Sequence, residues 1–380
     1  MARETRRLTL PAGRPGTERF VTVHRYGRAG DRPKVYCQAA LHADETPGLL
    51  VAHHLRRLLD EADDDGLIGG EVVLVPYANP IGLDQFVNVE LLGRLELAGG
   101  GNFNRNWPDL SGAVAERAQD SLTDDPVANV ARIRALAREV LAEREPASEL
   151  DGLRLLLAGL AVDADIVLDL HCDNDALMHL FLIPELWPEA SDLAADLGCR
   201  AVLTSEPSSG APFDEAFAGL WTRLAARFPD HPIPPACLSG TVELRGQPDV
   251  SDQLAETDAR ALFRFLQRRA VIEGDPGPLP EPLCQATGLD AVDTIKAPAA
   301  GVLSYTRELG DRVAEGEVVA HLIDPAAEDP AKARLAIRSG TDGMVLSRRV
   351  YKYVAAGMTV AKIVGTRPLP HRESGNLLED

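Results

Sequence analysis

His42 and Glu45 are the residues whose types and spacing most clearly suggest chemistry, because only two positions separate them in the motif His-Ala-Asp-Glu. They follow an apolar run over residues 35–41, so we expect them on a loop that leaves a buried strand. A neutral imidazole and a carboxylate placed in this way can bind one metal ion together. Catalytic zinc sites commonly use two histidines and one glutamate at about 2.0–2.2 Å. A histidine and a glutamate at this spacing also occur together by chance, so other parts of the chain must complete such a site.

A second histidine, His171, ends the predicted buried strand over residues 164–171. In open α/β sheets the ligand crevice lies at the carboxyl ends of the strands, so His42 and His171 are expected to face one crevice. Glu243 lies within a short predicted strand, where a charged side chain among apolar neighbours needs a partner or a chemical task. We interpret His179 as a hydrogen-bonded residue of the sheet rather than as a ligand.

The elements that must position these residues alternate between strand and helix. Apolar strands are predicted over residues 34–41, 71–76 and 164–171, and helices over residues 46–60, 126–160 and 251–272. This order favours an α/β fold with a mixed, largely parallel sheet flanked by helices. Thr46 followed by Pro47 is typical of a helix start, with Thr46 as the N-cap. Residues 77–109 show no regular pattern, and a segment of that length inside a domain is usually functional or disordered.

Composition excludes several classes of function. The chain has 380 residues and a formal net charge of −19 at pH 7, which argues against nucleic-acid binding. No run approaches the roughly 18 consecutive apolar residues of a membrane span. The five cysteines show no C-x-x-C spacing, so we expect neither a disulfide framework nor a cysteine zinc site. The Arg-rich N-terminus lacks the features of a secretory signal, and the expected location is the cytoplasm.

Taken in order, the motifs resemble those of the zinc carboxypeptidase superfamily and, within it, the succinylglutamate desuccinylase/aspartoacylase family. The resemblance rests on the following segments: His42 with Glu45, Asn104-Arg105, Leu170-His171, and Glu243 within Thr-Val-Glu-Leu-Arg. Each motif is short, but four of them in the family's order over residues 42–245 are specific. The resemblance implies hydrolysis of the amide bond of a small N-acyl amino acid. The alternatives are a metallocarboxypeptidase acting on short peptides and a non-catalytic binding protein on the same fold.

The resemblance also implies a metal site and a base. His42, Glu45 and His171 would bind Zn²⁺, one ion per chain, and would leave a coordination position for water. Glu243 would take a proton from that water as the general base and then deliver it to the leaving amine. The implied partner is a small N-acyl amino acid, with neither nucleic acid nor membrane, and a homo-oligomer is possible.

The same resemblance implies that three further residues bind the substrate. Asn104 and Arg105 would hold a substrate carboxylate, for which the planar guanidinium of arginine is well suited. Arg94 would polarise the scissile carbonyl and hold the developing oxyanion. No local motif fixes the assignment of Arg94, which rests on its place between Asn79 and Asn104.

This chain departs from the family pattern at two positions. Ala43 replaces the usual glycine after the first zinc histidine, and its methyl group could tighten the loop. Asn102 stands where many members carry an aspartate that orients that histidine. An asparagine still accepts a hydrogen bond from an imidazole but brings no charge, so the basicity of the ligand is expected to be lower. Asp44 is not expected to bind the metal.

The C-terminal third differs in kind and contains an internal repeat. Residues 300–303 are echoed by 342–345, and 313–318 by 354–359, about 41 residues further on. This pattern resembles an all-β barrel-sandwich domain of the biotinyl/lipoyl type, which we expect as a wall over the active-site mouth. The expected organisation is a zinc hydrolase catalytic domain over residues 1–285, with an arm at 1–19 and a linker at 273–290, then the β domain at 291–366 and a flexible tail at 367–380.

Overall fold

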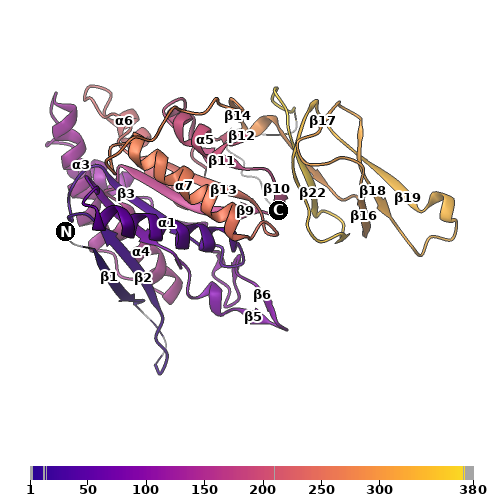
Figure 1. Cartoon of the computed structure of the whole chain (residues 1–380), viewed down its shortest axis with the longest axis horizontal. Helices are drawn as coiled ribbons and strands as arrows, with labels where there is room; N and C mark the ends of the chain where they lie inside the picture. The colour runs from indigo at the N-terminus through magenta and orange to yellow at the C-terminus, as the bar shows by residue number, and fades with distance from the viewer. Residues whose placement is uncertain (1–2, 12, 14, 209, 371, 373–380) are drawn as a thin grey trace.

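The structure is a computed structural model that describes residues 3–11, 13, 15–208, 210–370 and 372. A large α/β part is followed by a smaller β part, which lies at one end of the molecule (Figure 1). Among the described residues, no helix combines the length and the apolar composition that a membrane span requires.

Within the described residues, one nine-stranded sheet organises the α/β part. Its strands are β1 (Glu4–Thr9), β2 (Phe20–Tyr26), β3 (Lys34–Ala39), β4 (Glu71–Val75), β9 (Ile166–Asp173), β11 (His179–Leu182), β12 (Ala201–Thr204), β13 (Leu238–Gly246) and β14 (Ala286–Gly288). They lie side by side in the order β1-β2-β4-β3-β9-β13-β11-β12-β14. Neighbouring strands are parallel from β4 through β3 and β9 to β13, and again from β11 through β12 to β14. The predicted mixed, largely parallel sheet is therefore confirmed.

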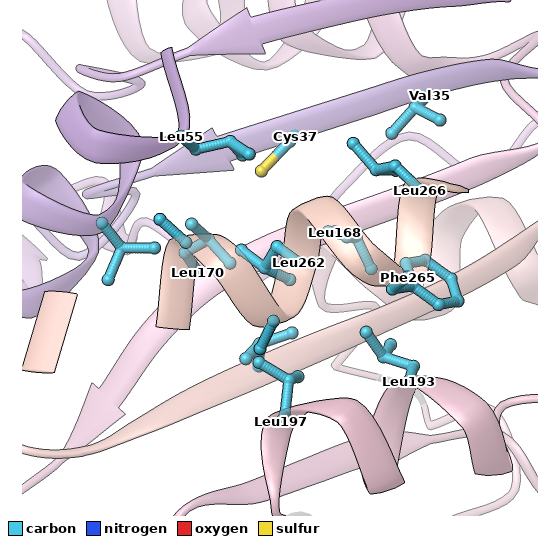
Figure 2. Packing of buried hydrophobic residues seen from close by; sticks show 14 of the residues in the cluster. Val35, Cys37, Leu55, Leu168, Leu170, Leu193, Leu197, Leu262, Phe265 and Leu266 are labelled. Atoms are coloured by element: carbon cyan, nitrogen blue, oxygen red, sulfur yellow. The ribbon is translucent and has the colours of Figure 1, made fainter. Parts of the chain in front are cut away.

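Helices cover both faces of this sheet. On one face lie α1 (Pro47–Asp64), α5 (Ser191–Leu197) and α7 (Asp252–Arg268), and on the other lie α2 (Ser111–Ala118), α3 (Pro126–Ala142), α4 (Glu149–Ala161) and α6 (Phe213–Arg227). Figure 2 shows Leu262 and Phe265 of α7 packed against Leu168 of the sheet. The neighbouring Val167 contacts the opposite core, because successive side chains of a strand point to opposite faces. Burial on both faces explains why the central strands are continuous apolar runs.

The helix boundaries confirm two predictions from the sequence. The break expected near Pro146 separates α3 from α4. Helix α1 begins at Pro47 as predicted, but Thr46 itself has helical backbone angles (φ −80°, ψ −20°) and its side chain makes no capping hydrogen bond. Thr46 is therefore the N-cap residue, as predicted, but its side chain does not cap the helix. A capping side chain needs an extended backbone at its own residue, as Ser148 has before α4.

The terminal segments also differ from expectation. The segment expected as an N-terminal arm is part of the sheet, because Glu4–Thr9 forms β1 and pairs antiparallel with β2. Its polar sequence has no apolar alternation that would predict a strand, because the pairing depends on backbone hydrogen bonds at the sheet edge. The expected linker contains β14, which pairs with β12. Most of the expected tail lies outside the described residues, although Leu369 is buried and donates its backbone N–H to the Asp290 carbonyl oxygen.

The C-terminal part is an antiparallel β structure, as predicted. Its strands are β15 (Val292–Lys296), β16 (Gly301–Tyr305), β17 (Arg312–Val313), β18 (Val318–Ile323), β19 (Arg334–Arg338), β20 (Gly343–Arg348), β21 (Tyr353–Val354) and β22 (Thr359–Val364). The first four correspond in order to the last four: β15 pairs with β22 as β19 pairs with β18, and β16 pairs with β21 as β20 pairs with β17. Both sheets contribute to one apolar core. The internal repeat of the sequence is thus a repeat of structure.

The two parts are joined close to the end of β9. Strand β10 (Asp175–Ala176) follows β9 directly and pairs with β20, so the α/β part adds a strand to a sheet of the β part. Asp175 also forms an ion pair with Arg348 at 3.0 Å. Beside it, Lys362 of β22 extends its Nζ to within 2.9 Å of Asp173 Oδ2. The β part is therefore anchored next to the end of β9, the strand that carries His171.

Candidate active site

His42 and Glu45 lie in the turn between β3 and α1. Ala40, directly after β3, has a left-handed backbone (φ 59°) that redirects the chain at the carboxyl edge of the sheet. The backbone N–H of Glu45 then donates to the His42 carbonyl oxygen, which closes the turn. As a result, His42 Nδ1 lies 2.9 Å from Glu45 Oε1, and both side chains are buried.

His171 reaches the same carboxylate from β9. Its Nδ1 lies 2.7 Å from Glu45 Oε2, so the Glu45 carboxylate bridges the two imidazoles. One ligand atom from each of His42, Glu45 and His171 lies within 4.8 Å of the others, and all three residues are buried. The structure thus brings together the three predicted metal ligands.

The Nε2 atoms of the two imidazoles, which face away from Glu45, also have hydrogen-bond partners. His42 Nε2 lies 2.8 Å from Asn102 Oδ1, which also accepts a hydrogen bond from the Asn104 backbone N–H. His171 Nε2 lies 2.8 Å from Asp169 Oδ2. Both neighbours are acceptors, so they favour a proton on each Nε2 and leave each Nδ1 lone pair facing Glu45. In metal-binding histidines, the ring nitrogen that does not bind the metal donates its N–H to an acceptor in this way.

Asp169 was missed by the sequence analysis. It is fully buried two positions before His171, on the same face of β9. Gln38 on β3 donates its amide to Asp169 Oδ1 at 3.0 Å, and the Tyr36 hydroxyl in turn donates to Gln38. A charged residue inside an apolar strand was the signal that could have revealed it, as it did for Glu243.

The chemistry of this donor set fits zinc. Two imidazole nitrogens and one carboxylate are a usual set of protein ligands for a catalytic zinc ion. Burial lowers the pKa of His171, but Asp169 and Glu45 outweigh burial and raise it well above its ordinary value. Burial opposes ionisation of Glu45, yet the two imidazoles hold the pKa of its carboxyl well below the usual range. The site is therefore built to stabilise positive charge.

Glu243 lies beside this cluster on β13. It is paired in register with His171 on the parallel strand β9. Burial, followed by repulsion from Glu45, raises the pKa of Glu243 to about 8. Its Oε2 is buried without a hydrogen-bond partner among the described residues. A carboxylate with a raised pKa and a free acceptor atom is suited to take up a proton.

Arg94, Asn104 and Arg105 come from residues 77–109, the stretch without a regular pattern. This stretch is ordered by two short hairpins, β5 (Phe86–Val87) with β6 (Glu90–Leu91) and β7 (Leu95–Glu96) with β8 (Gly101–Asn102). Arg94 Nη1 lies 3.1 Å from Glu45 Oε1. Arg105 donates to the Asn104 carbonyl oxygen, and Asn104 Oδ1 accepts from the Phe213 backbone N–H at 2.7 Å.

One cavity is lined by all seven residues predicted as metal ligands, catalytic residues or substrate-binding residues: His42, Glu45, Arg94, Asn104, Arg105, His171 and Glu243. Phe181, Leu203 and Leu289 add an apolar wall. Four further charged side chains that the sequence analysis did not single out also line the cavity: Asp173, Asp214, Glu215 and Lys362. Lys362 was recognisable only as a lysine within an apolar strand of an Arg-rich chain, and Asp214 resembled an ordinary first-turn helix residue.

The methyl group of Ala43 is accommodated by glycines. The Ala43 backbone N–H donates to the Gly93 carbonyl oxygen at 3.0 Å, and the side chain is fully buried. A Cβ added at Gly93 would lie 2.2 Å from the Asp44 backbone nitrogen, and one at Gly82 would lie 2.9 Å from the Ala43 Cβ. The loop that carries His42 is therefore packed against backbone that has no room for a side chain. Asp44 lies outside the ligand cluster.

Comparison with known proteins identifies the family. Residues 31–269 match the family model for the succinylglutamate desuccinylase/aspartoacylase catalytic domain. The chain belongs to this family. The family resemblance stated from the motifs is therefore confirmed, and the names within the family are those of deacylases.

Individual relatives cover almost the whole chain. The Nα-acetyl-L-2,4-diaminobutyric acid deacetylase of Halomonas elongata is 25% identical over 337 residues, which span 88% of this chain and 83% of the relative. The crystal structure of a family protein from Shewanella amazonensis matches with a TM-score of 0.84 at 25% identity, covering 95% of this chain and 98% of that one. The product-bound ectoine utilization protein EutE (DoeB) of Ruegeria pomeroyi shares the fold, with a TM-score of 0.65 at 17% identity over 96% of this chain and 95% of that one.

Proposed function

We propose that this protein is a zinc-dependent deacylase that hydrolyses the amide bond of a small N-acyl amino acid. The observation that carries the proposal is the convergence of a buried His42–Glu45–His171 cluster and the unpartnered carboxylate of Glu243 in one cavity. Membership of the family and the deacetylase of H. elongata support the class of substrate.

His42 Nδ1, His171 Nδ1 and the Glu45 carboxylate would hold the zinc ion. When bound, zinc polarises a carbonyl oxygen and lowers the pKa of water from 15.7 to about 7. If Glu45 binds the ion, its contact with Arg94 would weaken. Arg94 would then be available to the carbonyl oxygen of the scissile amide, where a fixed cation stabilises developing negative charge.

Glu243 moves the proton in this scheme. Its buried, unpartnered Oε2 accepts a proton from the attacking water and then delivers it to the nitrogen of the leaving amino acid. Positive charge at the three ligands offsets the repulsion between Glu45 and Glu243. The pKa of Glu243 is therefore expected to fall from its raised value towards neutrality, where a general base works best.

Asn104 and Arg105 hold the carboxylate of the amino-acid moiety. Asn104 is itself fixed through the Phe213 backbone N–H, and the Arg105 guanidinium is fixed by the Asn104 carbonyl oxygen. The guanidinium can still present further N–H groups to a carboxylate. We also infer that residues 1–285 act as the catalytic domain and that residues 291–366 limit the size of the substrate, because Lys362 of β22 lines the cavity.

The test is hydrolysis by zinc-loaded protein of a panel of N-acetyl, N-succinyl and N-formyl amino acids, compared with short peptides. We expect turnover of at least one small N-acyl amino acid and weaker cleavage of the peptides. Glu243→Gln should retain the metal yet lose nearly all turnover, about 10²–10⁴-fold. Preferential peptide cleavage would instead support a carboxypeptidase, and absence of all turnover in metal-loaded protein would support a binding protein.

A further inference from the structure

Asp214 is a buried carboxylate in the cavity to which the proposed reaction assigns no task. It lies in the first turn of α6, is only 5% exposed, and lines the cavity with the metal ligands. Removing a carboxylate from water without a compensating cation is unfavourable. The position therefore needs an explanation beyond packing.

No described side chain forms a hydrogen bond or an ion pair with Asp214. Burial, then the negative charges of Glu215 and Asp169, raise the pKa of Asp214 to about 7. The other carboxylates nearby differ: Asp173 is paired with Lys362 at 2.9 Å, and Glu215 accepts from the Ser208 hydroxyl at 2.8 Å.

The formal charges of the cavity wall also favour a cation near Asp214. Among the described residues, the wall contains five carboxylates (Glu45, Asp173, Asp214, Glu215 and Glu243) and three cationic side chains (Arg94, Arg105 and Lys362). Carboxylates outnumber cationic side chains in this wall. A substrate that carries a cation besides its carboxylate is therefore favoured over one that carries only the carboxylate.

Asp214 is also tied to the residues that hold the substrate carboxylate. Phe213, its immediate neighbour, donates its backbone N–H to Asn104 Oδ1 at 2.7 Å. The first turn of α6 and the Asn104-Arg105 pair therefore form one unit of the cavity wall. A carboxylate at Arg105 and a cation at Asp214 can accordingly belong to one small molecule.

We propose that Asp214 binds a cationic group on the side chain of the substrate, so that the preferred substrates are N-acyl derivatives of diamino acids. This inference rests on the proposed deacylase function and names its substrate class. Asp214 acts on substrate choice and takes no part in the proton transfers of Glu243.

Two matched substrate pairs test this assignment. Nα-Acetyl-L-2,4-diaminobutyrate is compared with Nα-acetyl-L-norvaline, and Nα-acetyl-L-ornithine with Nα-acetyl-L-norleucine, which replace the ammonium by a methyl group of similar size. We expect zinc-loaded wild type to prefer a cationic member by at least about tenfold in kcat/KM, the effect of about 1.4 kcal/mol. Asp214→Asn should reduce this preference to within about threefold while kcat/KM for the neutral member changes little.

Asp252→Asn is the matched control. Asp252 is also a carboxylate in the first turn of a helix, α7, but it lies outside the cavity and its side chain is 84% exposed. Its substitution removes the same favourable interaction with a helix N-terminus. It should leave the substrate preference unchanged.

Binding of the products separates this inference from the proposed function. Calorimetry with zinc-loaded protein should show tighter binding of L-2,4-diaminobutyrate than of L-norvaline, and Asp214→Asn should abolish the difference. That result without any hydrolysis would overturn the deacylase function and retain the role of Asp214. If the wild type hydrolyses or binds both members of each pair equally well, the role of Asp214 is overturned. This outcome does not depend on whether the Asp214→Asn variant folds. An equal loss for both members in Asp214→Asn would also overturn it.

Discussion

His42 and His171 present the same ring nitrogen to the same carboxylate, but different parts of the fold support them. His171 belongs to the central strand β9, and its Nε2 meets the charged, fully buried Asp169. That carboxylate is itself held by Gln38 of the neighbouring strand. His42 lies on a loop, and its Nε2 meets the neutral amide of Asn102, which belongs to the β7–β8 hairpin.

The difference shows how the site divides its tasks. The strand half of the site, His171 with Asp169, would provide a rigid ligand, because its support is part of the sheet and carries charge. The loop half, His42 with Asn102, would provide a ligand without charged support, and its position depends on packing between the His42 loop and Gly93. Arg94 and Arg105 belong to the segment on either side of this hairpin. Changes in the loop half are therefore expected to alter substrate groups as well as the metal.

Removing the charge behind His171 should have the largest effect. Asp169→Asn keeps the shape of the side chain but withdraws the negative charge that makes His171 basic. We expect the affinity for zinc to fall about 10–100-fold. A competition titration with a chromophoric chelator measures this, and circular dichroism verifies the fold. Unchanged affinity in a folded variant would contradict the strand half as the stronger support.

A larger side chain against the His42 loop should have the next largest effect on zinc affinity. In Gly93→Ala the new Cβ would lie 2.2 Å from the Asp44 backbone nitrogen, so the His42 loop must shift. We expect zinc affinity to fall about tenfold, because a ligand displaced by a few tenths of an ångström no longer matches the geometry. Gly112→Ala in α2 is the control, since a Cβ there meets no atom within 4 Å. Equal zinc affinity in the two variants would show that the loop is not tightly packed.

Adding charge to the loop half should have a smaller and opposite effect. Asn102→Asp gives His42 the kind of support that Asp169 gives His171. Its carboxylate can also still accept from the Asn104 backbone N–H. We expect zinc affinity to rise about three- to tenfold. A decrease, measured in the same chelator competition, would mean that the neutral amide suits this site better than a charge.

The smallest effect on zinc affinity is expected at the opposite end of β9. An ion pair there stabilises the fold without contacting the site. Asp163 precedes β9 and is paired with the buried Lys34. Burial raises the pKa of Asp163, but Lys34, Arg32 and Arg138 outweigh burial and hold that pKa below its ordinary value. The pair therefore stabilises the protein above the unfolded-state pKa of about 3.9 and loses this effect as the pH falls through the lower folded-state value.

Asp163→Asn tests this stabilisation in urea unfolding. The variant should be less stable than wild type at pH 7, and the difference in free energy of unfolding should shrink below pH of about 4. Zinc affinity at pH 7 should stay unchanged. A difference in stability that is independent of pH would contradict the ion pair as its cause.

The sequence allowed prediction of the candidate ligands and of Asn102, which supports His42, but not of Asp169, which supports His171. Apolar strands and their ends can be recognised from the sequence, and they indicate where the crevice of an α/β sheet lies. The candidate residues at such positions are His42, Glu45, His171 and Glu243. Asn102 was predicted as the neighbour of His42 from its place in the family motif, and the structure shows this contact.

The remaining features depend on tertiary packing. Asp214 approaches the cavity only because Phe213 docks on Asn104, more than one hundred positions earlier in the chain. Lys362 reaches Asp173 only because β10 joins a sheet of the β part. The pairing of β1 with β2 arises from backbone hydrogen bonds of a polar segment. Such contacts leave no local pattern in the sequence.

Direct titration of zinc tests the central claim. Chelator-treated protein should bind one equivalent of zinc per chain by calorimetry and elemental analysis, and Glu243→Gln should retain it. In His171→Ala, occupancy should fall below about a tenth of an equivalent. Wild-type protein that binds less than about a tenth of an equivalent, or His42→Ala and His171→Ala variants that both retain a full equivalent, would contradict the account.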